Sequence, residues 1–113
     1  MDLIEVADRI YNNCRLLAEE VQKLPSLCEQ SAQAQAAYDR EFGVAITTLK
    51  AKGEPVSIID KLARGKCHHF LLDKLVAEGK VKACNANINA IESRISAYQS
   101  INKHLANMNV EEL

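Results

Sequence analysis

Apolar side chains recur at alternating steps of four and three residues along the first part of the chain. The residues of this stripe are Leu3, Ala7, Ile10, Cys14, Leu17, Val21 and Leu24. Such spacing places side chains along one side of an α-helix and is typical of a helix that packs lengthwise against another helix. Asp2 is a predicted N-cap, and Glu5 stands where a capping-box partner is expected. The pattern therefore predicts a helix over residues 2–24 with one buried side.

Pro25 interrupts this helix, although the stripe continues in phase beyond it. The residues of the continued stripe are Cys28, Ser31, Gln35, Tyr38, Phe42, Ala45 and Leu49. A proline inside a helix removes a hydrogen bond and costs about 3 kcal/mol. Ser26 followed by Glu29 has the spacing of a new capping box. Two interpretations remain: one long helix kinked at Pro25, or two helices over residues 2–24 and 26–52.

Glycine and proline mark a turn after this helical region. Gly53 is predicted to end the helix, because glycine readily adopts the left-handed conformation found there, and Pro55 prevents the helix from continuing. Ser57 is predicted to cap a short helix over residues 57–64, which Gly65 ends. The predicted buried residues of this short helix are Ile58, Ile59 and Leu62.

The last predicted helix covers residues 66–108 and has a similar stripe, interrupted only at Asn102. The residues of this stripe are Val81, Cys84, Ile88, Ile91, Ile95, Tyr98 and Leu105. At about 1.5 Å rise per residue such a helix is on the order of 60 Å long, so it must lie along the first helices, another chain, or both. The prediction is a single helical domain over residues 1–113: an all-α antiparallel hairpin or helical bundle, folded back at residues 53–65.

Five apolar residues lie off these stripes and are predicted to stay partly exposed in the hairpin. They are Leu16, Ile46, Leu71, Leu75 and Ile101. Burying them requires more helices than one chain provides, so a coiled-coil homodimer or a higher oligomer is expected.

Charge and composition narrow the classes of protein. The formal net charge of −1 over 113 residues argues against a strongly basic nucleic-acid binder and against a strongly acidic protein. The first residues show no basic segment followed by an apolar run, and no stretch approaches the roughly 20 apolar residues of a membrane span. We therefore expect a cytoplasmic protein whose four cysteines are reduced.

Candidate chemistry gathers in residues 52–70. Cys67, His68 and His69 are adjacent, and on a helix their side chains point about 100° apart, so they do not converge on one metal ion. No serine or cysteine lies in a nucleophile motif, and His104 has no carboxylate partner evident from sequence. We expect no metal, no cofactor and no enzymatic activity.

Basic residues are concentrated in the same region. Residues 50–82 contain eight Lys and Arg against four acids, whereas residues 1–30 contain six acids against three bases. The short helix, glycine and following helix resemble a helix-turn-helix, but the second helix continues into a long stripe, as a bundle helix does. The basic residues are interpreted either as a solvated tip or as a partner-binding surface. The candidate partner-binding residues are Lys52, Lys61, Arg64, Lys66, His68, His69 and Lys74.

Residues 52–65 have the sequence KGEPVSIIDKLARG, and the last predicted helix carries Ala86, Ile88, Asn89, Ile91 and Ile95. Through these motifs, residues 38–98 resemble a family of small helical proteins from phages and prophages of Gram-positive bacteria. Members of this family have a helix that ends in a lysine-glycine-x-proline turn, a short segment with an alanine-arginine-glycine end, and a long final helix. The matching residues are Lys52, Gly53, Pro55, Val56, Ser57, Ile58, Ile59, Leu62, Ala63, Arg64, Gly65, Ala86, Ile88, Asn89, Ile91 and Ile95. The chain departs from the family at residues 66–70, where members carry more acidic or neutral residues.

The resemblance implies an early accessory protein of a phage, since the family is carried near recombination and single-strand-binding genes. Together with the long helical stripes it favours a protein that acts through protein–protein interaction, either inhibiting a host defence nuclease in the manner of an anti-CRISPR protein or assisting phage recombination. The alternatives are a helical protein that binds nucleic acid directly and a coiled-coil spacer with a structural role.

Overall fold

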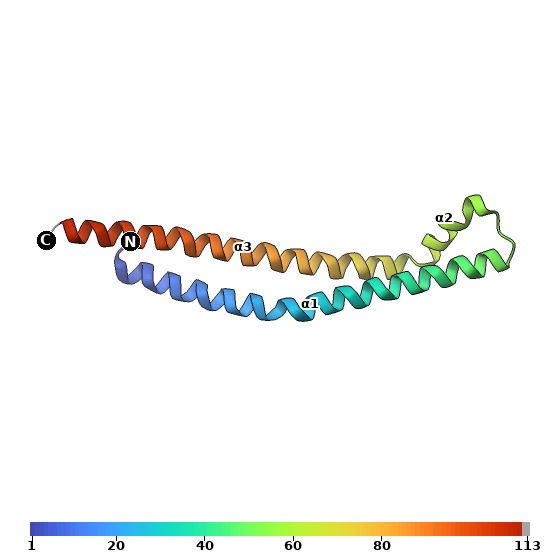
Figure 1. Cartoon of the computed structure of the whole chain (residues 1–113), viewed down its shortest axis with the longest axis horizontal. Helices are drawn as coiled ribbons and strands as arrows, with labels where there is room; N and C mark the ends of the chain where they lie inside the picture. The colour runs from blue at the N-terminus through green and yellow to red at the C-terminus, as the bar shows by residue number, and fades with distance from the viewer. Residues whose placement is uncertain (112–113) are drawn as a thin grey trace. The chain divides into compact units, whose positions relative to one another are not determined.

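The computed structural model describes the backbone of residues 1–111 and the side chains of residues 1–108. It contains three helices, α1 (Leu3–Ala51), α2 (Val56–Lys66) and α3 (His68–Glu111), and no strand within the described backbone. The all-α fold class predicted from the sequence is therefore confirmed. Contacts divide the chain into two compact units: Met1–Leu24 with α3 from Ala83 onward, and Pro25–Lys82. Within each unit α1 and α3 lie side by side in opposite directions (Figure 1).

Helix α1 passes through Pro25 without a break. Of the two interpretations left open at Pro25, the structure has the single long helix, and the separate helices over residues 2–24 and 26–52 are not formed. Pro25 has no N–H to donate to the carbonyl of Val21, but both residues are exposed. Water can hydrogen-bond to a carbonyl on an exposed helix face, which explains why the helix tolerates the proline.

The start of α1 is capped as predicted. The backbone N–H of Glu5 donates to Oδ1 of Asp2 at 2.8 Å. This bond satisfies one of the N–H groups that have no partner in the first turn of a helix.

The residues that α1 buries in the first unit differ in part from the predicted stripe. Ala7, Cys14 and Val21 are exposed, and the residue before each of them is buried or half-buried instead. We call the observed set the inner stripe: Leu3, Val6, Ile10, Asn13, Leu17, Glu20 and Leu24. In the predicted stripe and in the inner stripe alike, successive members are alternately three and four residues apart. The prediction chose the stripe that contains no Asn or Glu. The structure selects the more polar one.

Helix α3 buries the side that the sequence predicts. Cys84 and Ile91 are buried. The other predicted positions are half-buried: Val81, Ile88, Ile95, Tyr98 and Leu105, together with Asn102. Leu75 and Ile101 are exposed, as expected for apolar residues off the stripe.

The core of the second unit joins the end of α1 to α2. Its buried residues are Ala45, Leu49, Ile59, Ala63 and Cys67, with Tyr38, Phe42 and Ile46 packed against them. The predicted α1 stripe is confirmed here except at Cys28, which is exposed while Leu27 is half-buried. Ile58 and Leu62 were expected in the core but are exposed. Ile46, expected to be exposed, packs against the core, and Leu71 is half-buried.

A Schellman motif ends α1 and confirms the predicted turn at Gly53. This glycine has φ +79. Its N–H donates to the carbonyl of Lys50 at 3.0 Å, and the N–H of Glu54 donates to the carbonyl of Leu49 at 3.2 Å. These two bonds define the motif, and the positive φ requires a residue without Cβ.

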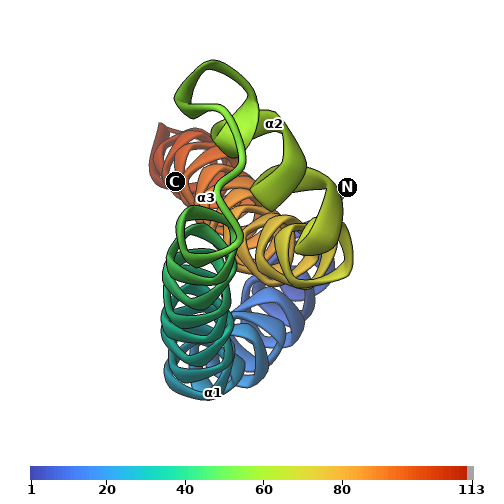
Figure 2. The same ribbon diagram turned by 90° about the vertical axis from the view of Figure 1, so that its right-hand side faces the viewer.

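Helix α2 has different ends from those predicted. Pro55, rather than Ser57, is its N-cap, and Gly65 lies inside the helix, which runs to Lys66. Cys67, with φ −104 and ψ 15, separates α2 from α3. Figure 2 looks onto this end of the second unit, where α2 lies next to the start of α3. The chain turns between α2 and α3 at Cys67, whose side chain is buried and fixes the backbone at this point.

No helix in the described part of the chain is long and apolar enough to cross a membrane.

Candidate interaction surface

The residues predicted to bind a partner all lie in the second unit. Lys52 follows the end of α1, and three of the others are exposed on α2. With about 100° per residue, Lys61 and Arg64 project about 60° apart, whereas Lys66 points about 160° away from Arg64. Asp60, also exposed, is one turn before Arg64. The fold therefore does not gather the basic side chains into one patch.

The two histidines make local contacts at the junction of α2 and α3. The Nδ1 of His68 lies 3.0 Å from the carbonyl oxygen of Gly65. A carbonyl oxygen only accepts, so this contact requires the tautomer that has its proton on Nδ1. The ring of His69 lies 4.2 Å from the ring of Phe70. These contacts orient both imidazoles against their own chain.

Lys74 is engaged within the second unit. Its Nζ lies 5.2 Å from the ring centre of Tyr38 on α1. The same atom is 4.0 Å from a carboxylate oxygen of Glu78, and the Lys74 side chain is only 22% exposed. A lysine held by an aromatic face and a carboxylate links two helices, so it is set apart from the exposed basic residues of the tip.

A groove lies between α1 and α3 in the second unit. Its volume is about 540 Å³. From α1 it is lined by Gln30, Gln33, Ala34 and Ala37; from α3 by Phe70, Leu72, Asp73, Val76, Ala77 and Lys80. Leu72 and Val76 are exposed. We call these ten residues the groove.

The sequence-based prediction missed the groove. Leu72 and Val76 were not singled out from the sequence. Their position off the α3 stripe was the available signal. Small side chains on one helix and aliphatic side chains on the other form a depression that only the pairing of the two helices creates.

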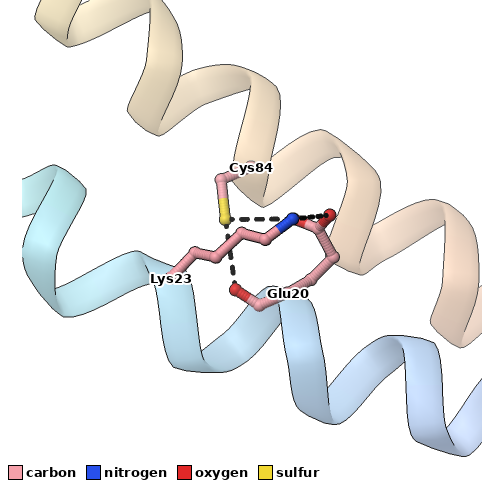
Figure 3. Close-up of polar contacts among 3 residues, drawn as sticks. All are labelled: Glu20, Lys23 and Cys84. Atoms are coloured by element: carbon pink, nitrogen blue, oxygen red, sulfur yellow. Dashed lines mark hydrogen bonds and ion pairs between the residues drawn. The ribbon is translucent and has the colours of Figure 1, made fainter.

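A polar contact joins α1 and α3 in the first unit (Figure 3). The Sγ of the buried Cys84 lies 3.4 Å from the backbone carbonyl oxygen of Glu20 and 3.5 Å from its Oε2. Lys23 donates to Oε1 of the same carboxylate at 3.1 Å. The thiol is the donor to both oxygens, so the glutamate of the inner stripe has polar partners.

The other polar residue of the inner stripe has one unpaired atom. Nδ2 of Asn13 donates to the carbonyl of Arg9 at 2.8 Å. Its Oδ1 is buried without a hydrogen-bond partner. Arg9 in turn reaches α3, with its guanidinium 5.9 Å from the ring centre of Tyr98.

Comparison with protein-family models, with curated proteins and with solved structures finds no match.

The remaining candidate chemistry consists of thiols and imidazoles. Among the described residues, no three His, Cys, Asp or Glu side chains form a group that could hold a metal ion. Cys14 and Cys28 are exposed, and Cys67 and Cys84 are buried. The groove and the exposed residues of the tip are therefore the features on which a function can be argued.

Proposed function

We propose that this chain is a non-catalytic interaction protein, and that it binds an amphipathic helix of a partner protein in the groove of the second unit. The observation that carries the proposal is the groove itself, with its volume of about 540 Å³ between two antiparallel helices. Amphipathic helices bind in such grooves by inserting side chains spaced three and four residues apart.

The chemistry of the groove supports a helical protein segment as the ligand. Three alanines at its base leave room for the larger side chains of a partner, and Leu72 and Val76 offer apolar contact at its edge. Gln30 and Gln33 supply amide donors and acceptors. Asp73 and Lys80 are its only charged residues and are opposite in sign. A phosphate backbone would instead favour several cations on one face.

The biological setting of the proposal comes from the resemblance to phage and prophage proteins. In that setting the chain acts in the cytoplasm of the host cell as an accessory protein. Its partner is a component of a host defence system, which it inhibits, or of the recombination machinery, which it assists.

The test compares two valine variants in affinity capture from infected host cells, with the bound proteins identified by mass spectrometry. Val76 is 49% exposed and lines the groove, whereas Val44 is 56% exposed and lies outside it. Val76→Glu should reduce recovery of the partner at least about tenfold, because a buried unpaired charge is costly. Val44→Glu should retain the partner. Equal recovery by the two variants contradicts the groove as the binding site.

A mobility-shift titration separates this proposal from direct nucleic-acid binding. Binding through phosphate contacts weakens steeply as salt is raised. The proposal is overturned if the chain binds DNA or RNA in this salt-dependent way and Lys61→Glu with Arg64→Glu abolishes that binding. A spacer function is indicated instead if the chain stays active after both charge reversals and after Val76→Glu.

A further inference from the structure

Helix α1 carries a second apolar stripe in the first unit, and no described residue of that unit buries it. It consists of Ile4, Ala7, Tyr11, Cys14, Ala18 and Val21, which we call the outer stripe. The steps between its members alternate between three and four residues, and all six are exposed. Ile4 is 75% and Tyr11 is 69% exposed. Large apolar side chains in such a continuous row are typical of a helix–helix contact.

The outer stripe lies beside the inner stripe rather than on top of it. Each of its members is one residue after a member of the inner stripe, which corresponds to about 100° around the helix. A second helix can therefore pack on the outer stripe without displacing α3. A helix with two such neighbouring stripes has two helical neighbours in a bundle.

The order of residues in the outer stripe is self-complementary for an antiparallel pair. About a midpoint between Asn12 and Asn13, Ile4 faces Val21 of the second copy. In the same register Ala7 faces Ala18 of the second copy, and Tyr11 faces Cys14 of the second copy. Aliphatic residues then pair at both ends, alanines pair between them, and each large Tyr11 lies against a small thiol. Layers that alternate large and small side chains pack without voids.

The charges that flank the outer stripe select the same arrangement. Asp8 and Arg15 are both exposed, lie seven residues apart on one edge of the stripe, and form no ion pair with any described residue. Across nearly the same midpoint, Asp8 faces Arg15 of the second copy, and the pair occurs twice by symmetry.

We propose that the outer stripe is the interface of a symmetric homodimer in which two copies of α1 pack antiparallel over residues 3–24. This proposal goes beyond the partner-binding function, because it concerns a different unit and a different face. Residues 3–24 span about 33 Å, so the interface is small. We expect a dimer that dissociates at roughly micromolar concentrations.

Sedimentation velocity over a range of concentrations gives the first test. Tyr11→Glu puts a charge at the centre of the outer stripe and should raise the dissociation constant at least about tenfold. Asn12→Glu adds the same charge at an exposed neighbouring residue outside the stripe and should leave the dimer intact. Circular dichroism should show unchanged helix content in both variants, because neither position is buried.

A charge swap tests the orientation. Arg15→Asp creates two Asp–Asp contacts and should weaken the dimer roughly tenfold to thirtyfold. Combining it with Asp8→Arg restores two opposite-charge contacts and should recover the original dissociation constant. If the double variant is as weak as the single one, the antiparallel register is wrong.

Cysteine cross-linking gives a direct readout of the register. In a background with Cys14→Ser and Cys28→Ser, the pair Ile4→Cys and Val21→Cys should form a disulfide between residues 4 and 21 of different copies on oxidation. Within one chain these residues are about 25 Å apart on a single helix and cannot be joined. Links from 4 to 4, or no link at all, would overturn the proposal, as would a monomer at the highest concentration tested.

The two proposals fail separately. Tyr11→Glu should still capture the partner protein through the groove, and Val76→Glu should still form the dimer. A chain that dimerises through the groove, so that Val76→Glu and not Tyr11→Glu yields monomers, contradicts the dimer proposal. It also gives the groove a second copy as its occupant.

Discussion

Replacing Asn13 by Leu should stabilise the protein. Asn13 is a member of the inner stripe and only 9% exposed, and its Oδ1 is buried without a partner. The two side chains branch in the same way at Cγ, so leucine places two methyl groups where the amide oxygen and nitrogen now lie. Leucine also has a higher helix propensity than asparagine.

The expected gain follows from three contributions. Removing a buried carbonyl that lacks a partner is worth about 1–3 kcal/mol. Burying two methyl groups contributes about 1.5 kcal/mol. The bond from Nδ2 to the carbonyl of Arg9, at 2.8 Å, is lost, which costs about 1 kcal/mol. The sum is a gain of about 1.5–3.5 kcal/mol, which raises Tm by roughly 5–20 °C for a chain of this size.

Thermal and urea unfolding followed by circular dichroism measure this gain at one fixed protein concentration, because dimerisation adds to apparent stability. Asn12→Leu is the matched control: Asn12 is exposed, so its replacement should change the unfolding free energy by less than about 0.5 kcal/mol. If Asn13→Leu lowers the stability or leaves it equal to the parent, the unpaired Oδ1 has a partner in solution and the reasoning is refuted.

The remaining predictions concern the turn, the first cap and the thiols. Gly43→Ala should raise the free energy of unfolding by about 0.5–1 kcal/mol, because an added Cβ there meets no atom within 4 Å. Gly53→Ala should lower it by about 1–2 kcal/mol, because Gly53 has φ +79. Urea unfolding measures both changes. Asp2→Ala removes the 2.8 Å bond to the N–H of Glu5 and should lower the unfolding free energy by about 0.5–2 kcal/mol, while Asp2→Asn should keep most of it. Under native conditions, at a protein concentration low enough for the proposed dimer to dissociate, a maleimide should label Cys14 and Cys28 rapidly. It should label Cys67 and Cys84 only as fast as the chain opens, as followed by mass spectrometry; rapid labelling of all four would contradict the burial of the last two.

The parts of the fold that follow from local chemistry were predictable from the sequence. Gly53 ends α1 and Asp2 caps its start, and each of these predictions depended on a single residue. The stripe of α3 was predictable because each turn of that helix offers one large apolar residue to bury. At Pro25 the sequence left a kinked helix and two separate helices open, and α1 runs through the proline. Local propensity weighs against proline in a helix, but an exposed carbonyl loses little when water replaces its partner.

The groove and the contacts of Lys74 could not be predicted by considering one helix at a time. Lys74 could be counted among the basic residues, but its place over Tyr38 depends on how α1 and α3 pair. The same pairing puts Ala34 and Ala37 beside Val76 and Ala77. The short helix was misjudged at Ile58 and Leu62 because a helix of three turns has room for only one buried line of residues, and Ile59 and Ala63 occupy it.

The failure of the predicted stripe in the first unit has a physical reason that bears on the dimer. Ala7, Cys14 and Val21 were expected inside because they are apolar, yet α3 packs on the side that carries Asn13 and Glu20. A helix that faced only one neighbour would gain by placing its apolar residues on that neighbour and its polar residues in water. Helix α1 does the reverse at these turns, and Glu20 is accommodated inside by Lys23 and the thiol of Cys84. An arrangement of this kind is favourable when the second apolar face is also buried, and this supports the proposal that the outer stripe packs against a second copy of α1.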